Sequence, residues 1–537
     1  MTDADEVAGA AAESRARSIV HDRPLLLSLL GLAVVAFLAR LLPVVLTGGL
    51  RGYIDYDDGV YMGTALALLR GTIVYRDFYM LHPPGIVYVL SPFAALSFVV
   101  SDAAAFMAAR VGFMLLGAVN TVLVGLLASR LGRWSALASA ALYAVWIVPI
   151  YTERSTWLVG PQNTLLLLAL LAMARRSRGS DGTPAPLGWR RAALVGALIG
   201  ACGAIQIWGA VTAAAVFVWL VVEVSRQRDR LRPLIAYVVA GIAALVLLLL
   251  PFFLAAGTKM IRIIIFDQLG RGGDRIPIGA RLRAIEGLPA SSHVPDAIVG
   301  AVFVAAVMVV VIGAWRRPAI RPWAWILAAQ LAFLFVTPSF FRHYSAWLAA
   351  TATVAIGSSV ATIAGWVAGR RGAGEVPLRP ASGVIGGGYA IALAGLLAIS
   401  TIPGTAGFHR PSDPFPSRQV ARALATARCP TADSATMLIL TGLLRRMLDN
   451  GCPVLVSPTG VSYDSDPTLR GPGRSRKNQV EYQAIMARYY GESDGAAFIR
   501  KESSNGLTDQ TWATIRSHLP VELRIGNKIT IYLPAGS

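Results

Sequence analysis

The sequence predicts an all-α polytopic membrane bundle of about eleven transmembrane helices, followed by a small C-terminal α/β domain. The first observation is composition: of the 537 residues, 55% are hydrophobic and 15% are charged, and the mean hydropathy is +0.57. A soluble protein of this size would struggle to stay in solution with that balance. The second is that apolar runs of about 20 residues, enough to cross a ~30 Å hydrocarbon core, recur from Pro24 to Pro403 and then stop.

Three regions follow from this pattern. Residues 1–23 are polar and mixed in charge, which predicts a disordered cytoplasmic lead-in rather than a signal peptide. Residues 24–403 form the expected membrane bundle, and residues 404–537 form an extracytoplasmic soluble domain. The expected spans are residues 24–46, 102–128, 134–151, 157–174, 190–206, 208–225, 233–256, 296–314, 322–337, 343–367 and 382–402.

The positive charge follows this topology. The formal net charge is +19, from 49 basic and 30 acidic residues, and the basic residues cluster in short loops between the apolar runs. With the N-terminus in the cytoplasm and two spans in 190–225, these clusters lie on the cytoplasmic side of the plasma membrane, as the positive-inside rule requires. We therefore expect these basic residues to lie at a lipid bilayer and not to bind nucleic acid. Residues 47–101 and 257–295 are then outer loops.

The C-terminal domain shows short β-like runs at 437–440, 454–456, 521–525 and 529–533. They alternate with helix-like stretches, and Gly526-Asn527 between the last two runs predicts a hairpin turn. Cys429 and Cys452 both lie in this domain, and an oxidising compartment would allow a disulfide between them. A structural metal site at these two cysteines is not expected, since no nearby His/Cys pair completes a tetrahedral ligand set.

Three carboxylates, Asp55, Asp57 and Asp58, fall within four residues at the start of the first outer loop. One such carboxylate can take a proton from a hydroxyl while a neighbouring carboxylate tunes its basicity. The cluster also suits a divalent cation with oxygen ligands, with Asp57 and Asp58 as the candidates. The structural alternative is that Asp57 or Asp58 caps a helix that runs from Gly59 to Arg70.

His82 precedes two prolines and an apolar stretch, 86–100, that is short for a full crossing and predicts an interfacial helix. Proline tolerates the first turn of a helix, and the residue before it is held extended, which directs His82 back toward the loop. His82 is a candidate for binding phosphate or substrate; a structural hydrogen bond is the alternative.

This loop resembles the first outer loop of GT-C glycosyltransferases, most closely the branch of protein O-mannosyltransferases and lipid A aminoarabinose transferases. The resemblance implies a multi-span bundle, two interfacial helices, a polyprenyl-phosphate sugar donor and an acidic pair that supplies the base. Relatives have Asp-Glu where this chain has Asp57-Asp58, and we expect Asp57 to be the base. The strings that carry the resemblance are Asp57-Asp58-Gly59-Val60-Tyr61, Tyr75-Arg76-Asp77 and His82-Pro83-Pro84-Gly85, and Asp55, Tyr61, Arg76, Asp77 and His82 are the substrate-binding candidates.

Two further segments add candidates for donor binding. His343-Tyr344, before a late span, resembles a His-Tyr pair that recurs in the GT-C class. The outer loop 257–295 is rich in arginine against the positive-inside pattern, so we expect Arg271 and Arg275 to bind a lipid phosphate. A solvated basic loop that touches anionic headgroups is the alternative.

The resemblance, together with the outer acidic and basic loops, implies an inverting transferase that moves a sugar from a polyprenyl-phosphate carrier to a hydroxyl of a glycan, glycolipid or protein on the outer face. By analogy with cell-envelope transferases, we expect mannose or arabinose as the sugar. A divalent cation is the only cofactor that the sequence suggests. The main alternative is a transporter or flippase of a lipid-linked glycan. Transporters tend to have related halves and ionisable residues near mid-membrane, and the sequence shows neither feature, which argues against this alternative. A structural membrane protein whose C-terminal domain is the active part is the third interpretation.

Overall fold

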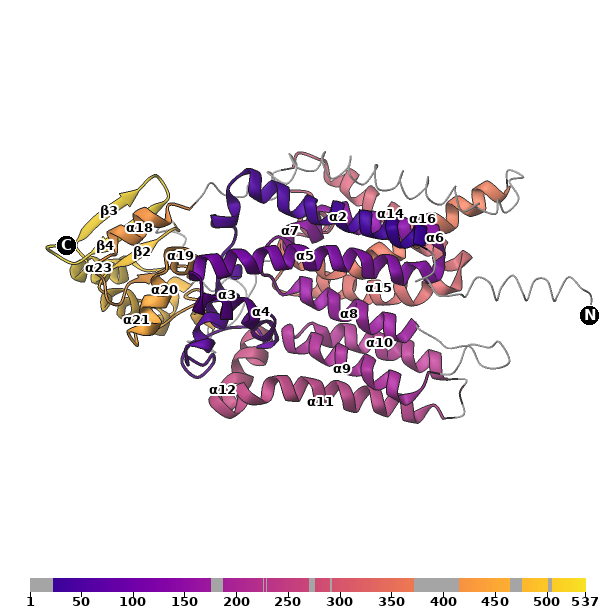
Figure 1. Ribbon diagram of the computed structural model, residues 1–537, viewed down its shortest axis with the longest axis horizontal. Coiled ribbons are helices and arrows are strands. Elements are labelled where there is room, and N and C mark those ends of the chain that lie inside the picture. Colours follow the sequence, from indigo (N-terminus) through magenta and orange to yellow (C-terminus); the bar gives the residue numbers. More distant parts are fainter. Residues whose placement is uncertain are drawn as a thin grey trace, which may run out of the picture.

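The computed structural model describes residues 23–174, 187–225, 227, 229–269, 276–289, 292–370, 415–463, 476–500 and 505–537. Its long helices lie along the longest axis of the molecule, and a smaller unit of short helices and strands covers one end of them (Figure 1). This smaller part is the C-terminal unit (residues 415–537). A helical bundle with a small C-terminal sheet is the class that the sequence predicts.

Six described helices are long and apolar enough to cross a membrane, and α6 (Arg133–Val145) with α7 (Ile147–Glu153), bent by 57°, makes a seventh candidate. The chain is therefore a multi-pass membrane protein. The number eleven stays a prediction, and the last expected span, 382–402, lies outside the described residues. The six helices are α2 (Arg23–Leu46), α5 (Asp102–Ala128), α11 (Leu231–Ala256), α14 (Asp296–Arg316), α15 (Arg321–Val336) and α16 (Ala349–Arg370), and shorter apolar helices are α8 (Val159–Ala174) and α10 (Gly209–Val224).

α9 (Trp189–Ile205) and α11 pack at close range through glycines. A Cβ atom on Gly200 would lie 2.1 Å from the carbonyl oxygen of Gly241. Small residues of this kind let membrane helices approach each other at backbone distance. A break separates α9 from α10, so the region 190–225 forms two helices rather than one.

A buried ion pair holds α2 against α7 inside the bundle. Glu153 Oε2 accepts hydrogen bonds from Arg40 Nε (3.0 Å) and Nη2 (2.6 Å), and both side chains are buried. Glu153 Oε1 accepts from Asn120 Nδ2 (2.8 Å) and Tyr143 Oη (2.6 Å). A buried charge is tolerated when it is paired and its remaining hydrogen-bonding capacity is satisfied, so this cluster joins α2, α5, α6 and α7.

Loop 47–101 carries the two expected helices. α3 (Asp57–Leu69) is followed by Gly71, which has a φ of 84°, a conformation that glycine adopts without strain. α4 (Gly85–Ala95) follows the two prolines and is too short to cross a bilayer alone. Residues 58–67 of α3 are all buried, because α4 and, from the C-terminal unit, α19 (Ala435–Thr441) both pack against this helix (Figure 1).

The C-terminal unit contains a four-stranded sheet with the strand order β1-β2-β4-β3. β1 and β2 are parallel, and the other two neighbouring pairs are antiparallel. The predicted hairpin is present as β3 and β4. The elements are α18 (Ser417–Ala423), β1 (Thr431–Ala432), α19 (Ala435–Thr441), α20 (Leu443–Asp449), α21 (Val480–Gly491), β2 (Ala496–Phe498), α23 (Asp509–His518), β3 (Val521–Ile525) and β4 (Ile529–Leu533).

Two of the predicted strands are wrong. Residues 437–440 lie in α19, and residues 454–456 form no strand. A short continuous apolar run has the same pattern in a buried strand and in a buried helix, so periodicity cannot separate them. α19 is apolar on all sides because it packs against α3 and α5 on one side and against β1 and α18 on the other.

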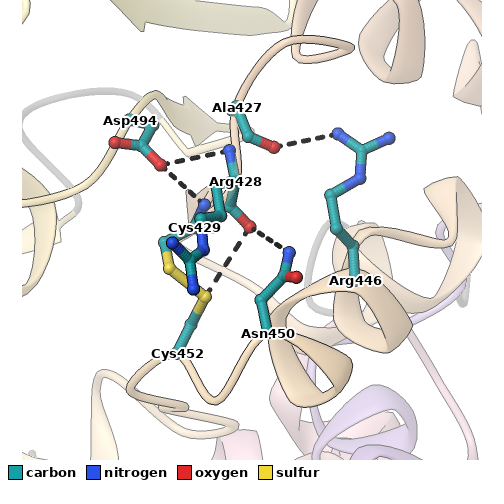
Figure 2. The surroundings of a disulfide bond; sticks show 7 residues. All are labelled: Ala427, Arg428, Cys429, Arg446, Asn450, Cys452 and Asp494. Carbon is teal, nitrogen blue, oxygen red and sulfur yellow. Dashed lines mark hydrogen bonds between the residues drawn. A yellow bond between two sulfur atoms is a disulfide. The ribbon is translucent and has the colours of Figure 1, made fainter.

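The structure contains the predicted Cys429–Cys452 disulfide, which joins the segment just before β1 to the segment just after α20 (Figure 2). The segment that it closes includes α19 and α20. Asp494 Oδ2 accepts hydrogen bonds from the backbone nitrogens of Arg428 (3.1 Å) and Cys429 (2.8 Å), which fixes the chain on one side of the bridge. Asn450 Nδ2 donates to the Arg428 carbonyl oxygen (3.0 Å) on the other side.

Candidate active site

A polar cavity of about 400 Å³ lies where loop 47–101, the C-terminal unit and the turn before α16 meet. It combines carboxylates, imidazoles, guanidinium groups and hydroxyls from these three parts of the sequence, together with Tyr151 of α7. Its polar lining consists of Asp55, Tyr56, Asp57, Tyr61, His82, Tyr151, Arg342, His343, Tyr344, Ser457, Thr459, Arg476 and Arg500.

Asp57 is the first residue of α3 and lines the cavity. Its backbone nitrogen donates a hydrogen bond to Asp55 Oδ1 (2.9 Å), so the two carboxylates are held in one turn. Asp55 lines the cavity as well. Burial, together with the charge of Asp57, raises the pKa of Asp55 well above its ordinary value. The pair that faces the cavity is therefore Asp55 and Asp57.

Asp58 is not part of the cavity lining. Its side chain is fully buried, and Oδ2 accepts from Arg110 Nε (3.1 Å) and Nη2 (2.7 Å). Oδ1 lies 3.1 Å from Thr436 Oγ1. The sequence treats Asp57 and Asp58 as one pair because they are adjacent, but successive helix residues point 100° apart, and here only Asp57 faces the cavity. The structure places Asp58 as a structural partner of Arg110.

Tyr61 and His82 lie side by side in the cavity wall, with their rings in an edge-to-face arrangement at 5.8 Å. Tyr75 Oη donates to the carbonyl oxygen of His82 (2.5 Å), which fixes the backbone at this position. Tyr75 itself has a φ of 70°, an uncommon conformation for a residue other than glycine. The loop thus places the His82 ring against Tyr61 in the cavity wall.

Arg76 and Asp77, two of the sequence candidates, do not line the cavity. They form an ion pair with each other on the surface, with 2.8 Å between Arg76 Nε and Asp77 Oδ1. Asp77 Oδ2 also accepts from the backbone nitrogen of Ile73 (2.7 Å). These contacts close the turn between α3 and α4, which is a structural reason for the Tyr-Arg-Asp string.

His343 and Tyr344 lie in the 3-10 helix η7 (Arg342–Leu348) and line the cavity opposite loop 47–101. Their rings pack on tryptophans, at 4.3 Å for His343 with Trp157 and 4.0 Å for Tyr344 with Trp208. Aromatic packing of this kind fixes ring orientation. The sequence resemblance therefore selects two residues that the fold brings close to Asp57.

The structure describes some of the arginines of the outer loop 257–295 and not others. Arg271 and Arg275 lie outside the described residues. Of the described arginines, Arg281 donates to the carbonyl oxygen of Leu334 (2.6 Å), and Arg283 pairs with Asp296 (2.7 Å). These two hold the loop against neighbouring helices and do not line the polar cavity.

Four polar lining residues come from the C-terminal unit: Ser457, Thr459, Arg476 and Arg500. No local sequence pattern marks them, because they are brought to the cavity by tertiary packing against loop 47–101. The nearest sequence signal is Tyr56 in the carboxylate cluster, whose hydroxyl accepts from Thr459 Oγ1 (3.0 Å).

Metal binding is not visible as a preformed cluster. Within the described ranges, no group of three or more His, Cys, Asp or Glu side chains is arranged to hold a metal ion. Asp58 is paired with Arg110 and does not line the cavity that Asp57 lines. The divalent cation at Asp57 and Asp58 stays a prediction from the sequence.

An apolar groove of about 430 Å³ lies between α9, α10 and α11. Pro83 lines this groove, and its chain neighbour His82 lines the polar cavity. Two residues of the π-helix η5 (Arg262–Asp267), Ile264 and Ile265, also line the groove. Consecutive residues of loop 47–101 thus line a polar cavity and an apolar groove.

No protein-family model matches the sequence, and no curated protein matches it either. Solved structures do match. ArnT from Cupriavidus metallidurans bound to undecaprenyl phosphate matches with a TM-score of 0.58 at 12% identity, over 93% of this chain and 97% of ArnT. Its apo state gives a TM-score of 0.56 at 12% identity over the same shares.

The archaeal oligosaccharyltransferase AglB from Archaeoglobus fulgidus, in complex with an inhibitory peptide and a dolichol-phosphate, matches with a TM-score of 0.52 at 13% identity. This match covers 90% of this chain and 70% of AglB. ArnT and AglB are both GT-C glycosyltransferases. The chain therefore has the fold of the GT-C membrane glycosyltransferases.

Proposed function

We propose that this chain is a membrane glycosyltransferase that moves a sugar from a polyprenyl-phosphate donor to a hydroxyl of an acceptor on the extracytoplasmic face. The observation that carries the proposal is that two consecutive residues line two different cavities. His82 lines the polar cavity that Asp57 also lines, and Pro83 lines an apolar groove. A lipid-linked sugar needs both environments side by side, because its head is polar and its tail is not.

The neighbouring structures support the class of donor. ArnT is bound to undecaprenyl phosphate and AglB to a dolichol-phosphate, and both ligands are polyprenyl phosphates. In this chain the groove between α9, α10 and α11 would take the isoprenoid tail. His82, Arg342, His343 and Tyr344 line the adjoining polar cavity and would bind the phosphate. Arg271 and Arg275 are assigned to the same phosphate as part of the proposal.

The mechanism is a single displacement. Asp57 accepts the proton of the acceptor hydroxyl as its oxygen forms a bond to the anomeric carbon. The bond between that carbon and the phosphate oxygen breaks, and its electron pair leaves with the polyprenyl phosphate. Cationic groups such as Arg342 stabilise the second negative charge that the phosphate gains. One displacement from the opposite face inverts the anomeric centre.

Asp55 would support this step without receiving the proton. Its Oδ1 accepts from the Asp57 backbone nitrogen and so fixes the first turn of α3. With its pKa raised, it also carries less negative charge than an exposed aspartate would near the phosphate. Asp57 is then the carboxylate in the cavity that is best placed to act as the base.

The remaining assignments belong to the same proposal. The N-terminus is cytoplasmic, residues 24–403 form the plasma-membrane domain, and residues 404–537 form the extracytoplasmic domain. The acceptor is a glycan, glycolipid or protein of the cell envelope, and mannose or arabinose is the sugar. A lipid-linked donor accounts for a site on this face, where nucleotide sugars are not supplied.

The test is sugar transfer by the purified full-length protein in detergent, with a panel of polyprenyl-phosphate sugars. We expect the wild type to release polyprenyl phosphate and Asp57→Asn to lower kcat by at least about 10²-fold at unchanged thermal stability. Asp509→Asn, an exposed aspartate of α23, is the matched control and keeps wild-type activity. Movement of intact lipid across liposomes without donor consumption would replace this function with transport.

A further inference from the structure

Arg500 is held in place by a buried carboxylate of the C-terminal unit. The two oxygens of Asp433 accept from the backbone nitrogens of Ile499 (3.0 Å) and Arg500 (2.9 Å). The Asp433 side chain is buried directly after β1, and these bonds join it to the residues that follow β2. The backbone of Arg500 therefore has one position, and its side chain lines the polar cavity.

Tyr56 gives the Arg500 side chain a platform. The Arg500 guanidinium lies 4.2 Å from the centre of the Tyr56 ring. The Tyr56 hydroxyl accepts from the backbone nitrogen of Thr459 (3.2 Å) and from Thr459 Oγ1 (3.0 Å), so the ring cannot turn away. A guanidinium stacked on an aromatic ring keeps its N–H groups free in its own plane for an oxyanion.

Arg476, the second guanidinium from the C-terminal unit, lines the same cavity. Within the described part of the chain, neither Arg476 nor Arg500 forms an ion pair with a carboxylate. With Arg342 there are three guanidinium groups in the lining against the two carboxylates Asp55 and Asp57. A sugar phosphodiester donor brings one negative charge, which balances the remaining positive charge if both carboxylates are ionised. Burial and the charge of Asp57 raise the pKa of Asp55 well above its ordinary value, so Asp55 carries less than a full negative charge and the cavity keeps cationic capacity for a second anion.

These arginines come from a different part of the chain than the residues beside the apolar groove. Pro83, which lines the groove, and His82, which lines the cavity, belong to loop 47–101. Arg476 and Arg500 belong to the C-terminal unit, which covers the end of the helical bundle (Figure 1). A molecule that arrives from outside the bilayer meets this unit before it reaches Asp57.

We propose that Arg476 and Arg500 form an anion subsite that binds a phosphate or carboxylate group of the acceptor. The subsite holds the acceptor so that a neighbouring hydroxyl reaches Asp57. The acceptor is thereby assigned to a chemical class, anionic glycans or glycolipids. The assignment of this ligand as the acceptor rests on the proposed function, whereas the binding of an oxyanion by the two arginines does not.

Binding is measured first, because it needs no turnover. Full-length protein in nanodiscs of zwitterionic lipid, with polyprenyl phosphate already bound, is titrated with glycerol phosphate in a calorimeter. We expect Arg500→Gln and Arg476→Gln each to weaken the binding of glycerol phosphate by about tenfold, as the loss of a charge-assisted contact predicts. Arg500→Lys keeps the charge without the planar fork and should lose less. Arg488→Gln, an exposed arginine of α21, is the matched control.

Two binding results would overturn the subsite. One is equal affinity for glycerol phosphate in the wild type and in the Arg476→Gln/Arg500→Gln double variant. The other is a loss of affinity for polyprenyl phosphate in these variants, which would assign the two arginines to the donor. A wild-type elution profile and an intact disulfide show that each variant is folded.

Turnover then tests the role. Envelope glycolipids separated by anion exchange into neutral and anionic pools are offered with the donor that the wild type consumes. We expect sugar transfer to the anionic pool, and a KM for that pool raised about tenfold in Arg500→Gln at an unchanged donor KM. Transfer to the neutral pool alone contradicts the acceptor class. If the wild type consumes no donor, the proposed function fails, and the calorimetric result still decides the subsite.

Discussion

Thr436 Oγ1 of the C-terminal unit lies 3.1 Å from Asp58 Oδ1 and 2.9 Å from the carbonyl oxygen of Asp55. One hydroxyl proton can be donated to either acceptor, so this single group connects the start of α19 to both ends of the carboxylate turn. Gly59 permits the contact, because a Cβ atom there would lie 2.1 Å from Thr436 Oγ1. The C-terminal unit is therefore part of what positions Asp57.

Replacing Thr436 tests this role. Thr436→Val keeps the shape of the side chain and removes the hydroxyl, and we expect kcat to fall about tenfold, the effect of one lost hydrogen bond to a charged group, with KM for the donor unchanged. Thr436→Ser keeps the hydroxyl and should retain most of the activity. The measurement is steady-state sugar transfer by both variants. Equal kcat values for valine and serine would show that the hydroxyl is dispensable.

Substitutions of Asp57 and Asp58 should have different effects, on activity for Asp57 and on stability for Asp58. Asp58 and Arg110 are both fully buried as an ion pair. Removing one partner of such a pair leaves an uncompensated buried charge and costs about 3–5 kcal/mol. We expect Arg110→Met and Asp58→Asn to lower the unfolding temperature of the detergent-solubilised protein, measured by intrinsic tryptophan fluorescence.

Asp57→Asn is the matched comparison for that experiment. Asp57 lines the cavity, so its loss should remove activity and leave the unfolding temperature near that of the wild type. A stable Asp58→Asn protein without activity would contradict the structural role of Asp58 and return it to the catalytic pair.

Much of the site is visible in the sequence because it is local. Asp55, Asp57, Tyr61 and His82 lie within one loop, and all four line the cavity. The hairpin of β3 and β4 and the two loop helices also depend on short-range signals such as Gly71 and turn residues, which the sequence shows directly.

The rest depends on long-range packing, which the sequence does not show. Arg500 is placed at the cavity by residues far away along the chain: Asp433 binds its backbone, and the Tyr56 ring packs against its guanidinium. Asp57 and Asp58 are neighbours in one helical turn, so their side chains point in different directions and only Asp58 meets Arg110. Their adjacency in the sequence does not reveal this difference in direction. Residues 437–440 are apolar on every side because α19 lies between two parts of the molecule, and an apolar run of that length is equally typical of a strand.

The disulfide should stabilise the unit that covers the cavity. Cys429 and Cys452 are 23 positions apart and enclose α19 and α20. Closing a loop of this length contributes about 2–4 kcal/mol. We expect the Cys429→Ser/Cys452→Ser variant to unfold at a lower temperature than the wild type, and dithiothreitol to lower the unfolding temperature of the wild type in the same direction.

Cys202 provides the control, since it is free and buried in α9. Dithiothreitol should destabilise Cys202→Ala as much as the wild type and should have no effect on the double serine variant. An effect of dithiothreitol on the double variant would place the sensitivity elsewhere in the chain.

The buried Asp433 predicts an unusual pH dependence of stability. Burial raises its pKa from an ordinary value near 3.8 to about 6 in the folded protein. A carboxyl group whose pKa is higher when folded stabilises the protein at low pH, and this stabilisation is lost as the pH rises from about 4 to about 6. The pKa difference corresponds to about 3 kcal/mol, so the contribution is large enough to measure.

Comparison with Asp433→Asn isolates this group from the other carboxylates. We expect the stability of the wild type relative to the variant to decrease between pH 4 and pH 6 and to be constant above pH 7, as measured by urea unfolding at each pH. A carboxylate stabilised mainly by ion pairing would give the opposite slope, with stability gained as the pH rises. That opposite slope would mean that attraction to the Arg500 guanidinium, rather than burial, sets the pKa of Asp433. The Arg500 side chain would then pair with Asp433 instead of facing the cavity.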